Sequence, residues 1–446
     1  MNNKHPLLEM IRLQKSGQAV GIYSACTANE YVLRACMQRA KETNSYCLIE
    51  ATANQVDQYG GYTGMKPVDF VNFVEKLAKQ ENLDMNKIIL GGDHLGPLTF
   101  AHLNEKEAME EAKMLVYDYV KAGFSKIHID TSMKVNDDNP NVRLSDQIIA
   151  KRGAILASVA EKAYNDLLKE NPNVLHPVYI IGSEVPIPGG SQDAKDNGVE
   201  VTKPEDFKAT YEAFKKAFID NDVKEAFEHV IAIVVQPGVE EKDAGCTEYD
   251  REKARELMVA IKDYPKLVFE GHSTDYQTKI KLKELVEDGV GILKVGPGLT
   301  FAYREALFAL AYAEKECVSK ELQSNFMEVL DEEMLKNPKY YHKHYHGTNE
   351  EIALKRKYSF SDRCRYYLPI ESVNNAINKM FDNFKNGVPL NLLSQFLPRQ
   401  YTRVREGLIE NNPVALVKDH IIDTINDYLF ASCQEKIYLH YINKEN

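Results

Sequence analysis

The sequence predicts an α/β protein, a (β/α)8 TIM barrel with a C-terminal helical extension. Eight short apolar runs, each followed by a stretch with helical spacing, precede residue 316. Runs such as IAIVV at 231–235 are almost continuously apolar, as a parallel sheet covered on both faces requires. The first run leads into SACTANE, which lacks the GxGxxG of an open dinucleotide-binding sheet. Eight repeats in roughly 300 residues therefore favour a closed barrel.

The elements alternate strictly along this part of the chain. The expected strands are Ala19–Tyr23, Tyr46–Ala51, Lys87–Gly92, Lys126–Thr131, Pro177–Ser183, Val230–Gln236, Lys266–Gly271 and Gly291–Val295. The expected helices between them include Val68–Gln80, Glu105–Lys121, Lys203–Ala217, Asp250–Lys262 and Thr278–Glu287. Beyond the last unit we expect only helices, at Glu316–Asn337, Ile370–Phe384 and Ala415–Ala431. This pattern divides the chain into a barrel over 1–316 and a helical extension over 317–446 that packs on it.

Composition excludes several classes of function. The 446 residues carry 55 Lys and Arg against 66 Asp and Glu, a formal charge of -11, and no basic patch typical of nucleic-acid binding. No apolar stretch is long enough for a membrane span or a signal peptide, so we expect a cytoplasmic protein without nucleic-acid or membrane partners. The seven cysteines are scattered singly, as reduced thiols are.

Polar residues follow nearly every expected strand. In a TIM barrel the carboxyl ends of the strands converge on one face, where the catalytic groups lie. Burying so many ionisable groups without partners would be costly, so the set indicates a site. The residues that we assign to it are the carboxylates Glu50, Asp93, Asp130 and Glu184, the imidazoles His94 and His272, and the polar groups Gln236, Ser273, Asp275 and Lys294.

Carboxylates, imidazoles and an amide suit a divalent metal of the zinc type, which polarises a ketose carbonyl or stabilises an enediolate. His94 follows Asp93 directly, so a ligand stands beside a general base. We expect His94, His272 and Glu184 as metal ligands and Asp93, Glu50 and Asp130 as catalytic carboxylates. Glu50 and Glu184 fit structural ion pairs equally well. His128 and Asp130 stand two positions apart on one strand, so their side chains point to the same side of the sheet. His128 then lies one layer deeper in the barrel than Asp130, which favours a structural role.

Two glycine-containing segments suit a phosphate. KVGPGLT at 294–300 follows the last strand, where backbone N–H groups at a helix start form an anion nest, so Gly296 and Gly298 join Lys294, Gln236, Ser273 and Asp275 as expected substrate-binding residues. PIPGGSQ at 186–192 is the second segment. In SDRCRYYLP at 361–369, Arg363 and Arg365 either cap an anionic substrate or pack the extension onto the barrel.

Long motifs at successive strand ends resemble those of a known family. IEATANQVDQYGGYTGM (49–65), ILGGDHLGP (89–97), SEVPIPGG (183–190), VVQPGVE (234–240), FEGHSTDYQT (269–278), LKVGPGLTFAYREALFAL (293–310) and SDRCRYYLP (361–369) are similar to the larger, so-called non-catalytic subunit of D-tagatose-1,6-bisphosphate aldolase. The resemblance covers nearly the whole chain. It implies a role in bacterial galactitol and N-acetylgalactosamine catabolism and a partner, the smaller class II aldolase subunit that carries the zinc chemistry.

The resemblance also bears on individual residues. Compared with the catalytic class II aldolases, which are only distantly similar, Asp93 and His94 stand at the strand-three catalytic and zinc pair, and His272 at the strand-seven zinc histidine. Gln236 replaces the strand-six zinc histidine, and an amide is a poor zinc ligand. Some family members carry the label tagatose-6-phosphate kinase, but this chain has no GxxxxGK[ST] loop, so we expect no nucleotide cofactor.

Two hypotheses follow. In the first, the chain supports the activity and stability of the class II catalytic subunit. In the second, it is itself an enzyme using zinc or manganese, which cleaves a ketose or sugar phosphate by a retro-aldol step or epimerises it at C4. There Asp93 moves the proton of the C4 hydroxyl and the 294–298 loop takes a phosphate. The C-terminal helices meet either the partner subunit or a second copy of the chain, as a homo-oligomer would require.

Overall fold

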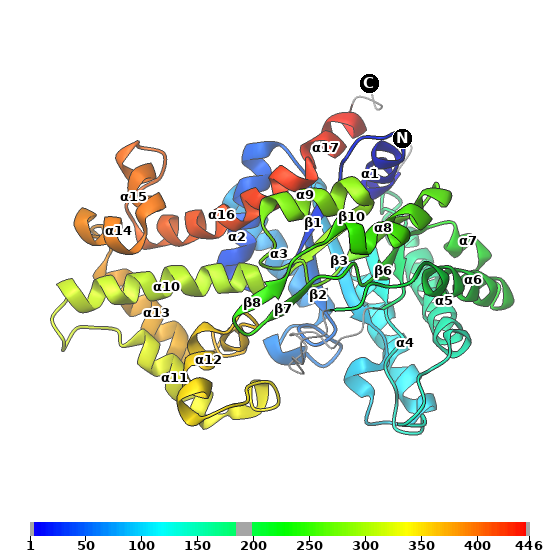
Figure 1. Cartoon of the computed structure of the whole chain (residues 1–446), viewed down its shortest axis with the longest axis horizontal. Coiled ribbons are helices and arrows are strands. Elements are labelled where there is room, and N and C mark those ends of the chain that lie inside the picture. Colours follow the sequence, from blue (N-terminus) through cyan, green and yellow to red (C-terminus); the bar gives the residue numbers. More distant parts are fainter. Residues whose placement is uncertain (1–3, 184–198, 443–446) are drawn as a thin grey trace.

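The computed structural model describes residues 4–183 and 199–442 and confirms the (β/α)8 barrel (Figure 1). Eight parallel strands close in the order β1-β10-β9-β6-β5-β4-β3-β2. Their bounds are β1 Ile22–Cys26, β2 Cys47–Thr52, β3 Ile88–Leu95, β4 Lys126–Ile129, β5 Val178–Ile181, β6 Val230–Val235, β9 Val268–Gly271 and β10 Val290–Val295. All eight overlap the expected strands. A short antiparallel hairpin, β7 Glu240–Lys242 with β8 Gly245–Thr247, was not expected.

The helices of the barrel are α1 Pro6–Lys15, α2 Glu30–Thr43, α3 Pro67–Glu81, α4 Glu105–Lys121, α5 Asp146–Glu170, α6 Pro204–Asp220, α7 Lys224–Phe227, α8 Arg251–Ala260, α9 Lys279–Asp288 and α10 Pro297–Cys317. The helices whose bounds the sequence predicted, which are α3, α4, α6, α8 and α9, agree with those bounds to within a few residues. Side-chain caps explain many of these starts: Asn29, Asn104, Ser145 and Thr278 each accept a hydrogen bond from the first turn of the helix that they precede.

The remaining helices are α11 Phe326–Lys336, α12 Asn349–Tyr358, α13 Glu371–Asn383, α14 Leu390–Phe396, α15 Pro398–Arg405, α16 Pro413–Ser432 and α17 Glu435–Ile442. One expectation was wrong: no single helix spans Glu316–Asn337. The chain leaves helix after Cys317, and the buried Glu314 carboxylate accepts hydrogen bonds from the N–H and hydroxyl of Ser324, which fixes the intervening turn. Within the described residues, no helix has the length and apolar character needed to cross a membrane.

Helix α16 links the extension to the barrel. In Figure 1, α10 runs outward towards α11–α15, and α16 returns and packs between α2, α9 and α10, against β1. Gln434, directly after it, accepts from Tyr23 N–H on β1 and donates to the Tyr46 carbonyl beside β2. A helix of the extension therefore covers the wall where the first and last strands meet. The division at residue 316 stays a prediction.

The barrel interior is layered along its axis. At the amino-terminal end, Ile22, Leu48, Ile89, Val268 and Ile292 form an apolar plug, closed from below by Leu7, Met10 and Ile11 of α1. Because side chains alternate along a strand, the next inward residues, two positions further, form the following layer. That layer is charged, and it contains Ser24, Glu50, Glu270 and Lys294. The fold thus places buried charge directly beneath the face on which active sites of such barrels lie.

Candidate functional site

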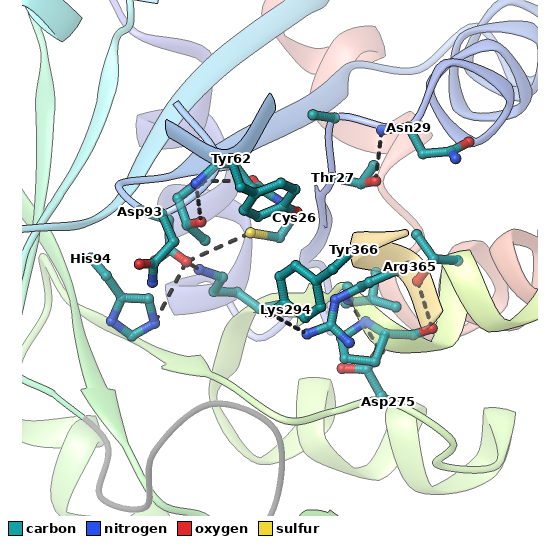
Figure 2. A pocket seen from close by; sticks show the side chains of 18 of the residues that line it. Cys26, Thr27, Asn29, Tyr62, Asp93, His94, Asp275, Lys294, Arg365 and Tyr366 are labelled. Carbon is teal, nitrogen blue, oxygen red and sulfur yellow. Dashed lines mark hydrogen bonds and ion pairs between the residues drawn. The ribbon is translucent and has the colours of Figure 1, made fainter. Parts of the chain in front are cut away.

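A cavity of about 180 Å³ opens at the carboxyl ends of the strands (Figure 2). Its walls include Cys26, Asn29, Gln55, Tyr62, Asp93, His94, Glu241, His272, Ser273, Asp275, Lys294, Gly296, Thr300, Arg365 and Tyr366. Most come from the loops after β1, β2, β3, β9 and β10, while Arg365 and Tyr366 come from the extension. Among the described residues, the sequence therefore located the site, but not its contribution from the extension.

Asp93 is the centre of the site. Its Oδ1 lies 2.8 Å from His128 Nδ1, and its Oδ2 contacts the Lys294 ammonium and lies 3.6 Å from both His94 Nε2 and Cys26 Sγ. Burial opposes ionisation, but the positive charges of these neighbours prevail and hold the pKa of Asp93 well below its usual range. Asp93 is therefore a permanently ionised carboxylate on the cavity wall.

His94 is held in a fixed orientation beside Asp93. Its Nδ1 lies 2.9 Å from Asp130 Oδ2, and Asp130 also accepts from the N–H and hydroxyl of Ser132. Asp130 is buried and does not line the cavity, so it orients the imidazole rather than meeting a ligand. The backbone of His94 has φ 51°, a strained conformation for a non-glycine residue that concentrates at functional sites. Together these contacts aim Nε2 at the Asp93 carboxylate.

Three imidazole rings meet in the site. The ring centroids of His94, His128 and His272 lie 5.0, 5.1 and 5.3 Å from one another. His272 Nε2 lies 3.0 Å from Glu270 Oε1, and burial, aided by Lys294, lowers the pKa of His272 to about 3, which keeps the ring neutral. His128 Nε2 faces the Gly182 carbonyl at 3.0 Å, and the hydrogen bond to Asp93 outweighs burial and raises the pKa of His128. The third imidazole thus comes from β4.

The layer beneath the cavity is a buried ion network. Lys126 is fully buried and bridges Glu50 and Glu270, the latter at 2.7 Å, and Lys294 lies 3.4 Å from the second oxygen of Glu50. The absence of a side chain at Gly91 leaves space for the Glu50 side chain, because a Cβ at position 91 would lie 2.7 Å from Glu50 Cγ. The lysines outweigh the effect of burial and lower the pKa of Glu270. Lys126, at the start of its strand, was not among the predicted residues.

A group of carboxylates and imidazoles in this site could hold a metal ion. Asp93, His128, Glu270 and His272 each offer a ligand atom, and these atoms lie within 4.8 Å of one another. Two carboxylates and two imidazoles suit zinc or manganese. His128 Nε2 lies 3.0 Å from the Gly182 carbonyl, which leaves Nδ1 of this ring as the atom turned towards the group. The residues therefore fit a divalent cation. His272 was an expected ligand, but His128 and Glu270 were not.

The other predicted residues are placed as follows. Ser273 lines the cavity, whereas Glu50 lies beneath it. The side-chain oxygen of Gln236 accepts from Gly238 N–H and Val239 N–H at 2.7 and 2.9 Å, so it holds the turn after β6 and does not line the cavity. Glu184 and the PIPGGSQ segment lie outside the described residues. The catalytic, metal-binding and substrate-binding roles stay predictions.

The predicted phosphate nest is already occupied by a side chain of the protein itself. Asp275 Oδ1 accepts from Gly296 N–H at 3.0 Å and from Gly298 N–H at 2.7 Å, at the start of α10. Burial, assisted by the negative charge of Glu241, outweighs these bonds and raises the pKa of Asp275 from 3.8 to about 7. A phosphate in this nest would have to displace Asp275.

The raised pKa of Asp275 makes stability depend on pH. Between about pH 4 and 7 the folded protein keeps a proton on Asp275 that the unfolded chain has lost, so stability falls as pH rises, by up to about 1.4 kcal/mol per unit. Asp275→Asn keeps a side-chain oxygen for the two N–H groups but cannot ionise. We expect wild type to lose unfolding free energy relative to this variant as pH rises from 5 to 7.5 in urea titrations. A constant difference would contradict the assignment.

Comparison with known proteins identifies the family to which the chain is related. Residues 7–434 match the family model described as D-tagatose-1,6-bisphosphate aldolase subunit GatZ/KbaZ-like. A solved structure described as a probable tagatose 6 phosphate kinase from Sinorhizobium meliloti is 41% identical, with a TM-score of 0.84 over 93% of this chain and 100% of that chain.

Two aldolase structures are far more distant. The fructose-bisphosphate aldolase from Campylobacter jejuni is 15% identical, with a TM-score of 0.43 over 91% of this chain and 95% of that one. The YdjI aldolase from Escherichia coli is 11% identical, with a TM-score of 0.39 over 83% of this chain and 98% of that one. These two likenesses carry no weight for function. The family model, in contrast, matches nearly the whole chain, and this protein belongs to the GatZ/KbaZ-like family of D-tagatose-1,6-bisphosphate aldolase subunits.

Proposed function

We propose that this chain is itself an enzyme that binds a phosphorylated ketose in the cavity and acts at C4. Removal of the C4 hydroxyl proton breaks the C3–C4 bond, giving an aldehyde and an enediolate. Protonation of the enediolate at C3 by the proton removed from the C4 hydroxyl, followed by release of both products, completes aldol cleavage. Re-addition of the enediolate to the other face of the aldehyde, with return of that proton to the C4 oxygen, completes C4 epimerisation. The observation that carries the proposal is Asp93, an ionised carboxylate on the cavity wall surrounded by His94, His128 and Lys294.

The residues around the cavity have different roles in this reaction. Asp93 accepts the proton of the C4 hydroxyl and returns it after re-addition. Lys294, whose pKa is raised because the Asp93 and Glu50 carboxylates outweigh burial, supplies a fixed positive charge for the enediolate. Asp130 holds His94 in place.

A divalent ion fits this reading, and we propose zinc or manganese. Glu270, His272 and His128, three residues of the group that offers ligand atoms, would hold it and leave Asp93 to act as the base. Such an ion would polarise the ketose carbonyl and lower the pKa of the C4 hydroxyl, which would allow a weakly basic carboxylate to accept its proton.

Metal content tests this part of the proposal. We expect about one divalent ion per chain after purification without chelators, measured by plasma mass spectrometry, and a lower melting temperature after chelation. His272→Ala should lose the ion. His420→Ala, on α16 and partnered with Glu305 away from the cavity, is the matched control and should keep it. A chain that takes up neither added zinc nor manganese would exclude the metal.

A second candidate is the supporting role. The family description favours it, and so does Gln236, whose oxygen is used within its own turn in place of a strand-six histidine ligand. Here the chain acts with a class II catalytic subunit in galactitol or N-acetylgalactosamine catabolism. The test is turnover of tagatose 1,6-bisphosphate and of tagatose 6-phosphate by the chain alone, by the partner alone and by both. Turnover by the chain alone supports the first proposal. Turnover only with the partner, above the partner's own rate, supports the second.

We place the protein in the cytoplasm, where phosphorylated sugars and reduced thiols are found. The seven cysteines are free, and Cys36, Cys47 and Cys364 are buried. The kinase name of the Sinorhizobium meliloti structure belongs to that protein. In this chain the sequence contains no GxxxxGK[ST] loop. An assay with ATP and tagatose 6-phosphate, followed by ADP release, is the direct check, and we expect no turnover.

A further inference from the structure

We propose that Arg365 holds the phosphate of the substrate, and that Asp275, by filling the glycine nest, restricts the substrate to a ketose with one phosphate. This inference rests on the proposed function and names its substrate class. It concerns the side of the cavity opposite Asp93 and His94. Figure 2 shows Arg365, Tyr366 and Asp275 on that side, with Lys294 between the two groups.

Arg365 is a cation without a carboxylate partner. Its Nη1 donates to the backbone carbonyls of Ser361 and Asp362 at 2.5 and 2.9 Å, and its Nη2 donates to the Tyr366 hydroxyl at 3.1 Å. With the described residues it forms no ion pair, whereas Lys294 is paired with Asp93 and Glu50. A guanidinium has five N–H donors, so Nε and one Nη2 hydrogen remain for a ligand. Although burial opposes it, the neighbouring Tyr366 and Asp362 raise the pKa of Arg365, so the guanidinium stays cationic and its two remaining donors suit a ligand anion.

The surroundings fix Arg365 in this position. Its guanidinium carbon lies 4.6 Å from the centroid of the Tyr366 ring, and Tyr366 packs edge-on against Tyr62 of the loop after β2, with ring centroids 4.9 Å apart. Thr300 of α10 donates to Asp362 at 2.5 Å, which ties the same segment to the last barrel helix. A guanidinium held by two backbone carbonyls and an aromatic ring is preorganised to bind phosphate through two parallel hydrogen bonds.

The second anion position in the cavity is filled. Gly296 and Gly298 point their N–H groups at Asp275 Oδ1, at the place where barrels of this type commonly bind phosphate. Arg365, in contrast, is a cationic group on the cavity wall that keeps donors for an anion. A ketose with a single phosphate, placed on Arg365, puts its carbon chain across Lys294 towards Asp93. A bisphosphate needs a second site, which Asp275 occupies.

Binding measurements test both halves of the proposal. The probes are D-fructose 6-phosphate, D-fructose 1,6-bisphosphate, D-fructose and inorganic phosphate, titrated calorimetrically into the full chain. We expect the monophosphate to bind at least tenfold more tightly than either the bisphosphate or the free sugar. Arg365→Met should weaken the monophosphate at least tenfold and leave the affinity for the free sugar unchanged. Arg365→Lys keeps the positive charge but cannot form two parallel hydrogen bonds. Its affinity for the monophosphate should lie between those of wild type and Arg365→Met.

Asp275 variants test the other half. Asp275→Ser removes the carboxylate and opens the nest, so affinity for the bisphosphate should rise at least tenfold relative to the monophosphate. Asp275→Asn keeps the nest filled and should not change the ratio. Arg363→Lys, on the same turn but off the cavity wall, is the matched control for folding and should bind as wild type. Melting temperatures identify any variant that has not folded, and Arg365→Lys then replaces Arg365→Met in the comparison.

The outcomes separate this inference from the proposed function. Equal affinities of wild type and Arg365→Met for the monophosphate, or bisphosphate binding as tight as monophosphate binding in wild type, would overturn the inference even if the chain turns over a ketose phosphate. Monophosphate binding that depends on Arg365 in a chain without turnover would uphold it and leave only the supporting role. Inorganic phosphate alone should bind weakly and compete with the monophosphate.

Discussion

Replacing Asp93 with asparagine should reduce the turnover number by about 1000-fold, because the variant keeps the shape of the side chain but cannot accept the C4 proton. The Michaelis constant should change far less, since Arg365 and the cavity walls remain. Steady-state kinetics with a ketose phosphate gives both numbers. Asp93 also neutralises Lys294 and His128, so the melting temperature must be measured alongside.

The matched control is Asp138→Asn. Asp138 forms two hydrogen bonds of 2.9 Å with Arg152, far from the cavity wall, so its replacement costs stability without touching the chemistry. We expect it to lower the melting temperature and keep the turnover number. If the two variants lose turnover in proportion to their loss of stability, Asp93 has no chemical role.

Lys126→Met should be the most destabilising single replacement in the barrel, lowering the free energy of unfolding by about 3–5 kcal/mol. Lys126 is fully buried, and its removal leaves the carboxylates of Glu50 and Glu270 without their shared counter-ion. Urea denaturation at pH 7 measures the effect. Its sign follows from burial, which disfavours the ionised form of Glu270: without Lys126 this carboxylate either stays charged without its counter-ion or takes up a proton, and both cost stability.

Two companions make this test specific. Lys113→Met removes an ion pair with Glu110 on the surface and should cost no more than about 1 kcal/mol. Adding Glu270→Gln to Lys126→Met removes one of the orphaned charges and should restore part of the lost stability. A loss below about 1 kcal/mol for Lys126→Met alone would show that water or a proton replaces the lysine at little cost.

The barrel was predictable because its signals are local. Each strand is a short apolar run, and each helix has its own spacing and cap, so strands such as Val230–Val235 and helices such as α4 were recognised within a few residues. The break after Cys317 was missed because Glu314 and Ser324, which fix it, meet only in three dimensions. The return of α16 to the barrel wall is also a tertiary contact, and no local pattern indicates it.

The same distinction applies to the site. Strand-end position alone brought Asp93, His94, His272, Asp275 and Lys294 to one cavity, because parallel strands end on one face. The rule failed for Lys126, which stands at the start of its strand and reaches inward along the barrel axis. It also gave no partners: that Asp275 fills the nest of Gly296 and Gly298 is visible only from their hydrogen bonds.

Arg365 shows a third limit. The sequence left open whether this arginine packs the extension or caps a substrate, since its distance along the chain from the barrel strands says nothing about the cavity. The structure places it on the cavity wall. Its lack of a carboxylate partner, which motivates the phosphate site, is likewise a property of the folded chain alone.

The most direct measurement incubates the purified chain alone, loaded with zinc or manganese, with fructose 6-phosphate labelled with ¹³C at C4 and follows the label by NMR. The account predicts that the label moves to the C4 epimer or to a three-carbon aldehyde, and that the Asp93→Asn chain produces neither above background. A wild-type chain that holds the metal and binds the sugar, yet leaves the label in place until a class II partner is added, would contradict it.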